Sequence, residues 1–319
     1  MNLAASSRTK GKWQFNTMVA PAVFLLLFFF NCVFTKNFAS INTIWNLVMQ
    51  TTAVLLISLG MTMVISGGGI DISIGSIMAI TAMTFAKTIN ATDSVALALL
   101  LSFAVGVVCG LINGVVVARF HIQPMIATMA MMYILRSLSK VWSNGGTVSF
   151  NSSLSKWVYY RIGGVLPIQV FIILAAGILF FILAYYTRFG VYVEACGNNL
   201  SAARSAGVRV IFYSIMTYVL CGVMAASAGI LESLMVSSAD PINLGEAYEM
   251  DAIAATVVGG TPIAGGKPNI VGTIFGAFTL QMITQMINMN NVQFEYTYVV
   301  KSVVIILAVL AHSIKNRRR

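Results

Sequence analysis

The stretch "SGGGIDISIGS", Ser66–Ser76, places three glycines and a carboxylate between two long apolar segments. Glycine destabilises a helix interior and allows the chain to turn sharply. The stretch therefore predicts a break between two helices, with Asp71 at the start of the second. A carboxylate there accepts hydrogen bonds from free backbone N–H groups and lies at the positive end of the helix dipole. We assign this structural role to Gly68, Gly69, Asp71 and Ser73; the alternative is that Asp71 is a buried acid that binds a ligand.

The composition excludes an ordinary soluble protein. Of the 319 residues, 58% are hydrophobic and only 9% are charged, and the mean hydropathy is +0.88. Soluble domains carry about 25% charged residues, so this chain lacks the polar groups needed to cover its surface in water. The sequence predicts an all-α polytopic membrane protein.

Apolar segments that approach or reach the length of a membrane span recur along the chain. A spanning helix needs about 20 mostly apolar residues. We expect about ten transmembrane helices within a domain at 17–314, some of them broken at glycine-rich stretches. The expected segments are approximately 17–35, 44–65, 71–89, 94–118, 124–142, 166–186, 211–237, 248–264, 269–290 and 297–314.

The basic residues predict the orientation in the membrane. Lys and Arg gather in an N-terminal tail at 1–16, after the fourth and sixth apolar segments, at Lys267, and in a C-terminal tail at 315–319. The positive-inside rule makes the side that carries these residues the cytoplasmic side. Both ends of the chain are therefore expected in the cytoplasm. The basic C-terminal tail is either a simple topology anchor or a contact with anionic lipid headgroups.

One of the two longer connections is expected on the outer side, at about 143–165. It carries Trp157, Tyr159 and Tyr160, and such aromatic residues are typical of the membrane–water interface. The connection is either an ordered interfacial loop or a short helix that faces a partner outside the cell.

The other long connection is expected on the cytoplasmic side, at about 187–210. Asn198 or Asn199 can cap a short helix in it, and Gly207 can end that helix. This helix is too short and too polar to span a membrane. It either docks into another protein or simply connects two spans.

Residues for catalysis or metal binding are scarce. The chain has two histidines, and its four cysteines show no metal-ligand spacing. Gly265–Lys267 reads "GGK", but a phosphate-binding loop requires a glycine where Thr261 stands and a hydroxyl where Pro268 stands. We therefore expect no enzyme activity, no ATP hydrolysis and no cofactor in this chain itself.

Two groups of amides recur at helical spacing. One group occupies positions 42, 46 and 50, and the other occupies positions 281, 285 and 288. Residues at these spacings share one face of a helix, and amides both donate and accept hydrogen bonds. They either line a path for a hydroxylated solute or bond neighbouring helices to one another. The candidates for the path are Asn46, Gln50, Gln281, Gln285 and Asn288.

Three stretches resemble the signature regions of a known family. They are "GMTMVISGGGIDISIGSIMAI" (Gly60–Ile80), "GNNLSAARSAGV" (Gly197–Val208) and "EMDAIAATVVGGTPIAGG" (Glu249–Gly266). In this order they resemble the sugar-type permeases of ATP-binding-cassette (ABC) transporters, the ribose, xylose and galactose group. Within the group, "VSFNSSLSKW" and "VEACGNNLSAARSAGV" are most similar to the galactofuranose-type permease.

The resemblance implies a bacterial cytoplasmic membrane protein with ten helices. It also implies a second permease chain, identical or homologous, an extracytoplasmic sugar-binding protein, and cytoplasmic ATPase subunits that hold the ATP and Mg²⁺. Membrane lipid is the remaining partner, and no nucleic acid is expected. Carried over by position, the element that couples the permease to the ATPase comprises Asn199, Leu200, Ala202, Ala203, Arg204 and Ala206.

Two alternatives remain open from the sequence. An ion- or proton-coupled carrier needs carboxylates within the membrane as relays, and Glu232 is the main candidate, although a structural role suits it as well. The second alternative is an ABC permease for another small solute, such as a branched amino acid or a nucleoside.

Overall fold

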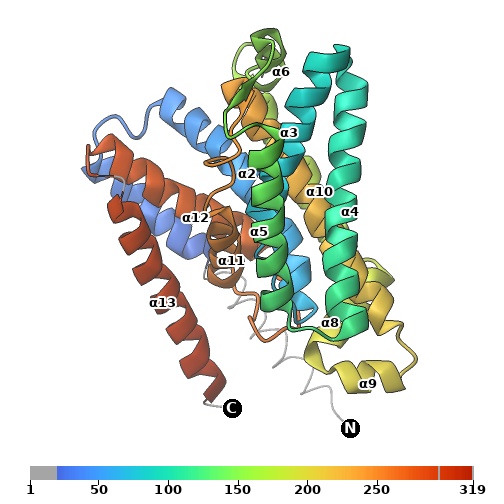
Figure 1. The fold of residues 1–319 in the computed structure, drawn as a ribbon. Coiled ribbons are helices and arrows are strands. Elements are labelled where there is room, and N and C mark those ends of the chain that lie inside the picture. Colours follow the sequence, from blue (N-terminus) through green and yellow to red (C-terminus); the bar gives the residue numbers. More distant parts are fainter. Residues whose placement is uncertain (1–19, 294, 318–319) are drawn as a thin grey trace.

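The computed structural model describes residues 20–293 and 295–317, and these residues form a bundle of helices (Figure 1). Each of the ten predicted segments contains a helix within the described residues; 1–16 and 318–319 lie outside them. These helices are Ala20–Phe34, α2 (Ile41–Ser66), α3 (Ile74–Thr92), α4 (Val95–Phe120), α5 (Pro124–Trp142), α7 (Ile168–Tyr185), α10 (Val210–Val236), α11 (Tyr248–Val258), α12 (Ile270–Met289) and α13 (Glu295–Arg317).

Length and composition confirm the class of the protein. Among the described helices, α2, α4, α7, α10 and α12 are each long and apolar enough to cross a membrane, and Ala20–Phe34 is a shorter apolar helix. The chain is therefore an all-α polytopic membrane protein. Its strands comprise two residues each where the structure describes them.

One predicted boundary is wrong, and the last helix extends further than expected. The segment expected at 248–264 is helical only as far as Val258, because Gly259, Gly260 and Thr261 turn the chain, with Gly260 at φ +92°. At 1.5 Å per residue, α11 is only about 17 Å long, short of the roughly 30 Å hydrocarbon core. At the other end of the chain, α13 continues to Arg317, so part of the tail expected at 315–319 is helical.

The opening glycines break the chain where predicted. The helix α2 ends at Ser66, and Gly68 adopts φ +85°, a conformation that glycine reaches at little cost. The Gly68 N–H donates to the Ile65 carbonyl oxygen at 2.9 Å, which closes the last turn. The next helix, α3, begins only at Ile74.

The core surrounds α2, whose side chains are buried almost continuously from Thr51 to Ser66. It packs against α7, α10, α11 and α12, while α3 packs against α4, α5 and α10. Because α2 is covered by protein on most sides, it does not need an apolar lipid-facing stripe. Thr51, Thr52, Ser58 and Thr62 donate their hydroxyls to carbonyl oxygens one turn earlier in the helix; the Ser58 hydroxyl, for example, donates to the Val54 carbonyl oxygen at 2.6 Å.

The contact between α4 and α10 depends on small residues. Gly106, Gly110 and Gly114 recur every fourth residue on α4 and face α10. A Cβ atom at Gly110 would collide with the Tyr218 carbonyl oxygen, and one at Gly222 would collide with the Gly106 carbonyl oxygen. Small residues at this spacing let membrane helices approach until their backbones touch.

Short elements occupy the two ends of the bundle. The outer connection contains η1 (Ser152–Leu154) and α6 (Ser155–Val158), together with the paired strands β2 (Arg161–Ile162) and β3 (Leu166–Pro167). Its β1 (Val148–Ser149) pairs antiparallel with β4 (Ser238–Ala239). At the opposite end lie α8 (Arg188–Asn198) and α9 (Leu200–Ser205), the end towards which α13 also descends (Figure 1).

The short helix expected in the inner connection is α9. Asn199 caps it, its side chain accepting from the Ala202 N–H at 3.0 Å, and Gly207 follows at φ +82°. The sequence analysis missed the preceding helix α8. Its two glycines, Gly190 and Gly197, and its mixture of polar and apolar residues are more typical of a loop. The only local signal is Thr187, whose hydroxyl accepts from the Gly190 N–H at 3.5 Å.

Candidate translocation path and coupling site

Asp71 is fully buried just before α3. Its Oδ1 accepts from the Ser73 backbone N–H at 2.9 Å and from the Ser73 hydroxyl at 2.6 Å. Asn113 on α4 donates to the Ser73 hydroxyl at 2.7 Å and lies 3.4 Å from the same carboxylate oxygen. This geometry suits a carboxylate that holds the start of α3. Asn113 was missed by the sequence reasoning; a lone amide inside an apolar segment was its only signal.

The Asp71 network has one unpaired atom. Its Oδ2 has no hydrogen-bond partner among the described residues, and neither does the hydroxyl of Tyr218 on α10. Tyr218 is 2% exposed and lies against Gly69, where a Cβ atom would collide with its hydroxyl. Gly68 and Gly69 lie within the turn between α2 and α3, and Gly69 leaves space for the hydroxyl end of Tyr218.

Backbone contacts connect the ends of α2, α8 and α11. The Gly266 N–H, in the turn between α11 and α12, donates to the Ser66 carbonyl oxygen at 2.9 Å. Gly197, near the end of α8, lies against both groups, and a Cβ atom there would collide with each of them. We call Ser66, Gly197, Gly265 and Gly266 the glycine junction. It joins three segments that are far apart in the sequence.

The predicted coupling residues divide between two faces of α9. Ala203 is buried and packs in a cluster with Cys196 and Val210. Its side chain therefore anchors α9 to the bundle, and its part in coupling stays a prediction. The predicted residues that are exposed are Asn199, Leu200, Ala202, Arg204 and Ala206.

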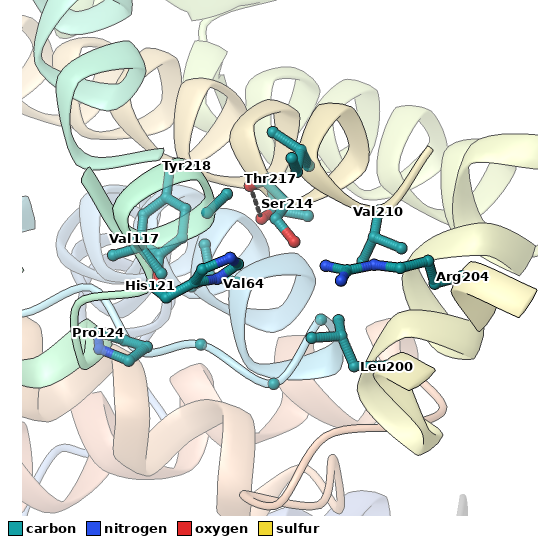
Figure 2. A pocket seen from close by; sticks show the side chains of 15 residues that line it. Val64, Val117, His121, Pro124, Leu200, Arg204, Val210, Ser214, Thr217 and Tyr218 are labelled. Carbon is teal, nitrogen blue, oxygen red and sulfur yellow. Dashed lines mark hydrogen bonds between the residues drawn. The ribbon is translucent and has the colours of Figure 1, made fainter. Parts of the chain in front are cut away.

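A pocket opens beside α9. Leu200 and Arg204, one helical turn apart on α9, form one wall, and His121 at the end of α4 lies across from them. Ser214 and Tyr218 on α10 also line it, together with Gly67–Gly69. Figure 2 shows the Arg204 guanidinium and the His121 imidazole pointing into the space below the Ser214 hydroxyl.

The predicted amides lie where α2 and α12 run side by side (Figure 1). The Gln281 Nε2 donates to the Gln50 Oε1 at 2.9 Å, and the Gln285 Nε2 donates to the Thr43 carbonyl oxygen at 3.0 Å. Gln285 is buried, so its bond helps to join the two helices. Asn46 and Asn288 are exposed. The five amides are therefore brought onto neighbouring helices, but their contact with a solute stays a prediction.

Two acidic residues at α11 and the neighbouring α10 have specific partners. Tyr248 donates its hydroxyl to the Glu232 Oε1 at 2.8 Å, which fits a structural role for Glu232. Lys301 on α13 forms an ion pair with Asp251 on α11, at 2.8 Å to Oδ2 and 2.9 Å to Oδ1. The sequence reasoning missed this pair, although a lysine inside the last apolar segment is a signal for one.

The connection between α10 and α11 is hydrogen-bonded to a side chain of α5. The Arg136 guanidinium on α5 donates to the Leu244 carbonyl oxygen at 2.7 Å and to the Ile242 carbonyl oxygen at 3.3 Å. Within the connection, partial burial acts to raise the pKa of Asp240, but hydrogen bonds from the Asn243 side chain and from the backbone N–H groups of Asn243 and Ile242 lower it below its ordinary value. Asp240 is therefore ionised in this turn at neutral pH.

A comparison with protein-family models identifies residues 43–309 as a branched-chain amino acid transport system / permease component. The match covers most of the chain, from the first turn of α2 into α13. The chain belongs to this permease family.

Individual relatives of this permease are named as sugar importers. The ribose import permease protein RbsC of Escherichia coli K12 is 38% identical, over 88% of this chain and 89% of the relative. The galactofuranose transporter permease protein YtfT of the same strain is 37% identical, over 83% of this chain and 77% of the relative. The fructose import permease protein FruF of Bifidobacterium longum is 32% identical, over 89% of this chain and 84% of the relative. No solved structure matches this chain.

These relatives confirm the resemblance to the sugar-type ABC permeases. The identities with the ribose and the galactofuranose permeases are nearly equal. They therefore do not single out the galactofuranose type that the two shorter stretches suggested.

Proposed function

We propose that this chain is the membrane-spanning permease subunit of an ABC importer and forms the translocation path for a monosaccharide. The proposal rests on relatives that are named as permeases for ribose, galactofuranose and fructose and that align along most of both chains. The amides on α2 and α12 support a hydroxylated cargo, because they offer uncharged donors and acceptors to sugar hydroxyls.

The main structural support for a translocation path at α2 and α12 is the exposure of Asn46 and Asn288. An amide turned towards lipid without a hydrogen bond costs roughly 2–7 kcal/mol. Their exposure on membrane helices therefore favours water or a second chain at this face. In our proposal a second permease chain, identical or homologous, faces α2 and α12 and encloses the path between the two chains.

We further propose ten passages through a bacterial cytoplasmic membrane, with both ends of the chain in the cytoplasm. The short α11 makes one passage together with the turn that follows it, in the manner of the broken helices of other transporters. Irregular backbone is tolerated at membrane depth when protein covers it. The burial of the turn residue Thr261 and of the preceding α11 residue Thr256 fits this condition.

The cytoplasmic ATPase is proposed to dock on α9 and to bind ATP and Mg²⁺ itself. The exposed α9 residues Leu200 and Arg204 would contact it, while Ala203 fixes the helix from behind. An extracytoplasmic sugar-binding protein would approach the opposite end of the bundle, where the connection 143–165 exposes Trp157 and Tyr160.

The test is uptake into liposomes that contain this chain together with its partner ATPase and the cognate binding protein. We expect uptake of one monosaccharide that requires ATP and the binding protein. Uptake by this chain alone, driven by an ion gradient, would contradict the proposal. The family model favours one second candidate, a branched-chain amino acid. The solute that the purified binding protein retains distinguishes the two.

A further inference from the structure

The pocket beside α9 presents hydrogen-bond donors from three sides. Arg204 enters from α9, His121 from the end of α4, and Ser214 from α10 (Figure 2). None of the residues that line the pocket is acidic, and no described residue accepts a hydrogen bond from or pairs with the Arg204 guanidinium. The pocket thus gathers several donors, and its lining contains no carboxylate.

Two further features favour an anion in this pocket. The first turn of α10, with Val210 and Ile211, forms part of the wall, and a helix N-terminus attracts negative charge through its free N–H groups and its dipole. Independently, Tyr218 lines the inner wall with a hydroxyl that is buried and unpaired among the described residues. Buried polar groups normally have a partner, and an occupant or the water that it retains would supply one.

The arrangement of donors selects the class of anion. A carboxylate offers two oxygens in one plane, whereas a phosphate group offers three or four oxygens directed to different sides. Arginine binds phosphate through two parallel N–H···O bonds, which leaves further oxygens for donors on other sides. We propose that this pocket binds a phosphate group, supplied either by free phosphate or by the headgroup of an anionic lipid.

Binding there would connect α9 to α4 and α10. Arg204 belongs to the exposed side of α9, and it has no described partner that fixes its position. A phosphate held between Arg204, His121 and Ser214 would restrain α9 relative to the bundle. The binding site does not depend on which solute is carried, so its test is independent of the proposed function.

The test uses the full chain in an uncharged maltoside detergent. Inorganic phosphate is titrated against chloride at constant ionic strength, and the unfolding temperature is measured. We expect a saturating rise, because a ligand that binds only the folded state stabilises it. Arg204→Gln should weaken the apparent affinity by roughly tenfold, the value of one charge-assisted hydrogen bond. His121→Gln should also weaken it. Arg209→Gln removes the same charge from the same connection outside this pocket, and it should leave the affinity unchanged.

A second arm repeats the titration with short-chain phosphatidylglycerol in place of phosphate. A saturating rise with the same dependence on Arg204 would identify the lipid headgroup as the source. A rise that is equal in the original chain, Arg204→Gln and Arg209→Gln is a bulk salt effect. The proposal would be overturned by an equal rise in the three proteins in both titrations, or by no rise in unfolding temperature in either titration. Without ligand, each variant must also unfold near the temperature of the original chain. If Arg204→Gln unfolds at a clearly lower temperature, Ser214→Ala replaces it as the pocket variant.

Discussion

The Gly266 N–H donates a hydrogen bond to the Ser66 carbonyl oxygen at 2.9 Å, although 200 residues separate them in the sequence. Gly197 lies against both groups and is followed within three residues by α9. The end of the buried helix α2, the turn after α11 and the end of α8, which leads into α9, are thus in direct backbone contact. A displacement of α9 would reach the broken helices through this contact without an intervening side chain.

Gly197→Ala should therefore be destabilising. A methyl group at this position collides with backbone atoms of Ser66 and Gly266, and forcing extra volume into a close-packed site costs about 1–3 kcal/mol. The expected result is a lower unfolding temperature and weaker coupling of ATP hydrolysis to uptake. Gly67→Ala is the matched control, because a Cβ atom there makes only ordinary contacts and the backbone φ is −76°. Equal unfolding temperatures for the two variants would contradict this account of the junction.

The amides of α2 and α12 should separate into two groups. Asn46→Leu and Asn288→Leu alter exposed positions and should reduce uptake by about fivefold, the equivalent of one lost hydrogen bond, with little loss of stability. Gln285→Leu also removes the bond to the Thr43 carbonyl oxygen and should lower the unfolding temperature. The measurements are uptake and thermal unfolding of the same preparations. The control is Ile178→Leu on exposed α7; if uptake by Asn46→Leu and Asn288→Leu equals that of this control, neither residue lines the path.

Features that depend on local sequence were predictable. The lengths of the apolar segments located the helices, the glycines after Ser66 located the break, and Asn199 located the start of α9. Features that depend on distant residues were not. The partners of Asp71 include Asn113, 42 positions away, and Lys301 pairs with Asp251 across 50 positions. The early end of α11 was missed because the apolar residues continue up to Gly259, so that hydropathy alone did not mark the turn.

The ion pair between Lys301 and Asp251 should stabilise α13 against α11. Lys301→Met leaves the Asp251 carboxylate without its partner in a largely buried position. Removing one member of a buried pair costs 3–5 kcal/mol, and we expect about 3 kcal/mol because Asp251 is partly exposed. The double variant Lys301→Met with Asp251→Asn should recover most of this loss, because no uncompensated charge remains. The free energy of unfolding of the two variants measures the difference, and a double variant as unstable as Lys301→Met would argue against the pair.

Variants on the two faces of α9 should both impair ATPase stimulation but should differ in unfolding temperature. Arg204→Glu reverses an exposed charge and should impair stimulation of the ATPase while the unfolding temperature stays unchanged. Ala203→Glu places a charge among Cys196 and Val210, and it should lower both quantities. The ATPase is assayed in the assembled transporter, and unfolding is followed on the permease alone. If Arg204→Glu retains normal ATPase stimulation, the exposed side of α9 is not the docking surface.

Asp71 should act as a hydrogen-bond acceptor and not as a required charge. Asp71→Asn keeps an oxygen that can accept from the Ser73 N–H and hydroxyl, and it removes a buried carboxylate whose Oδ2 has no described partner. Asp71→Ala leaves the two Ser73 donors unpaired, at a cost of about 1–3 kcal/mol for each buried group. We therefore expect Asp71→Asn to unfold close to the original chain and to retain uptake, while Asp71→Ala is clearly less stable. If Asp71→Asn retains stability but abolishes uptake, the carboxylate charge is used in transport, and the role as a helix start is insufficient.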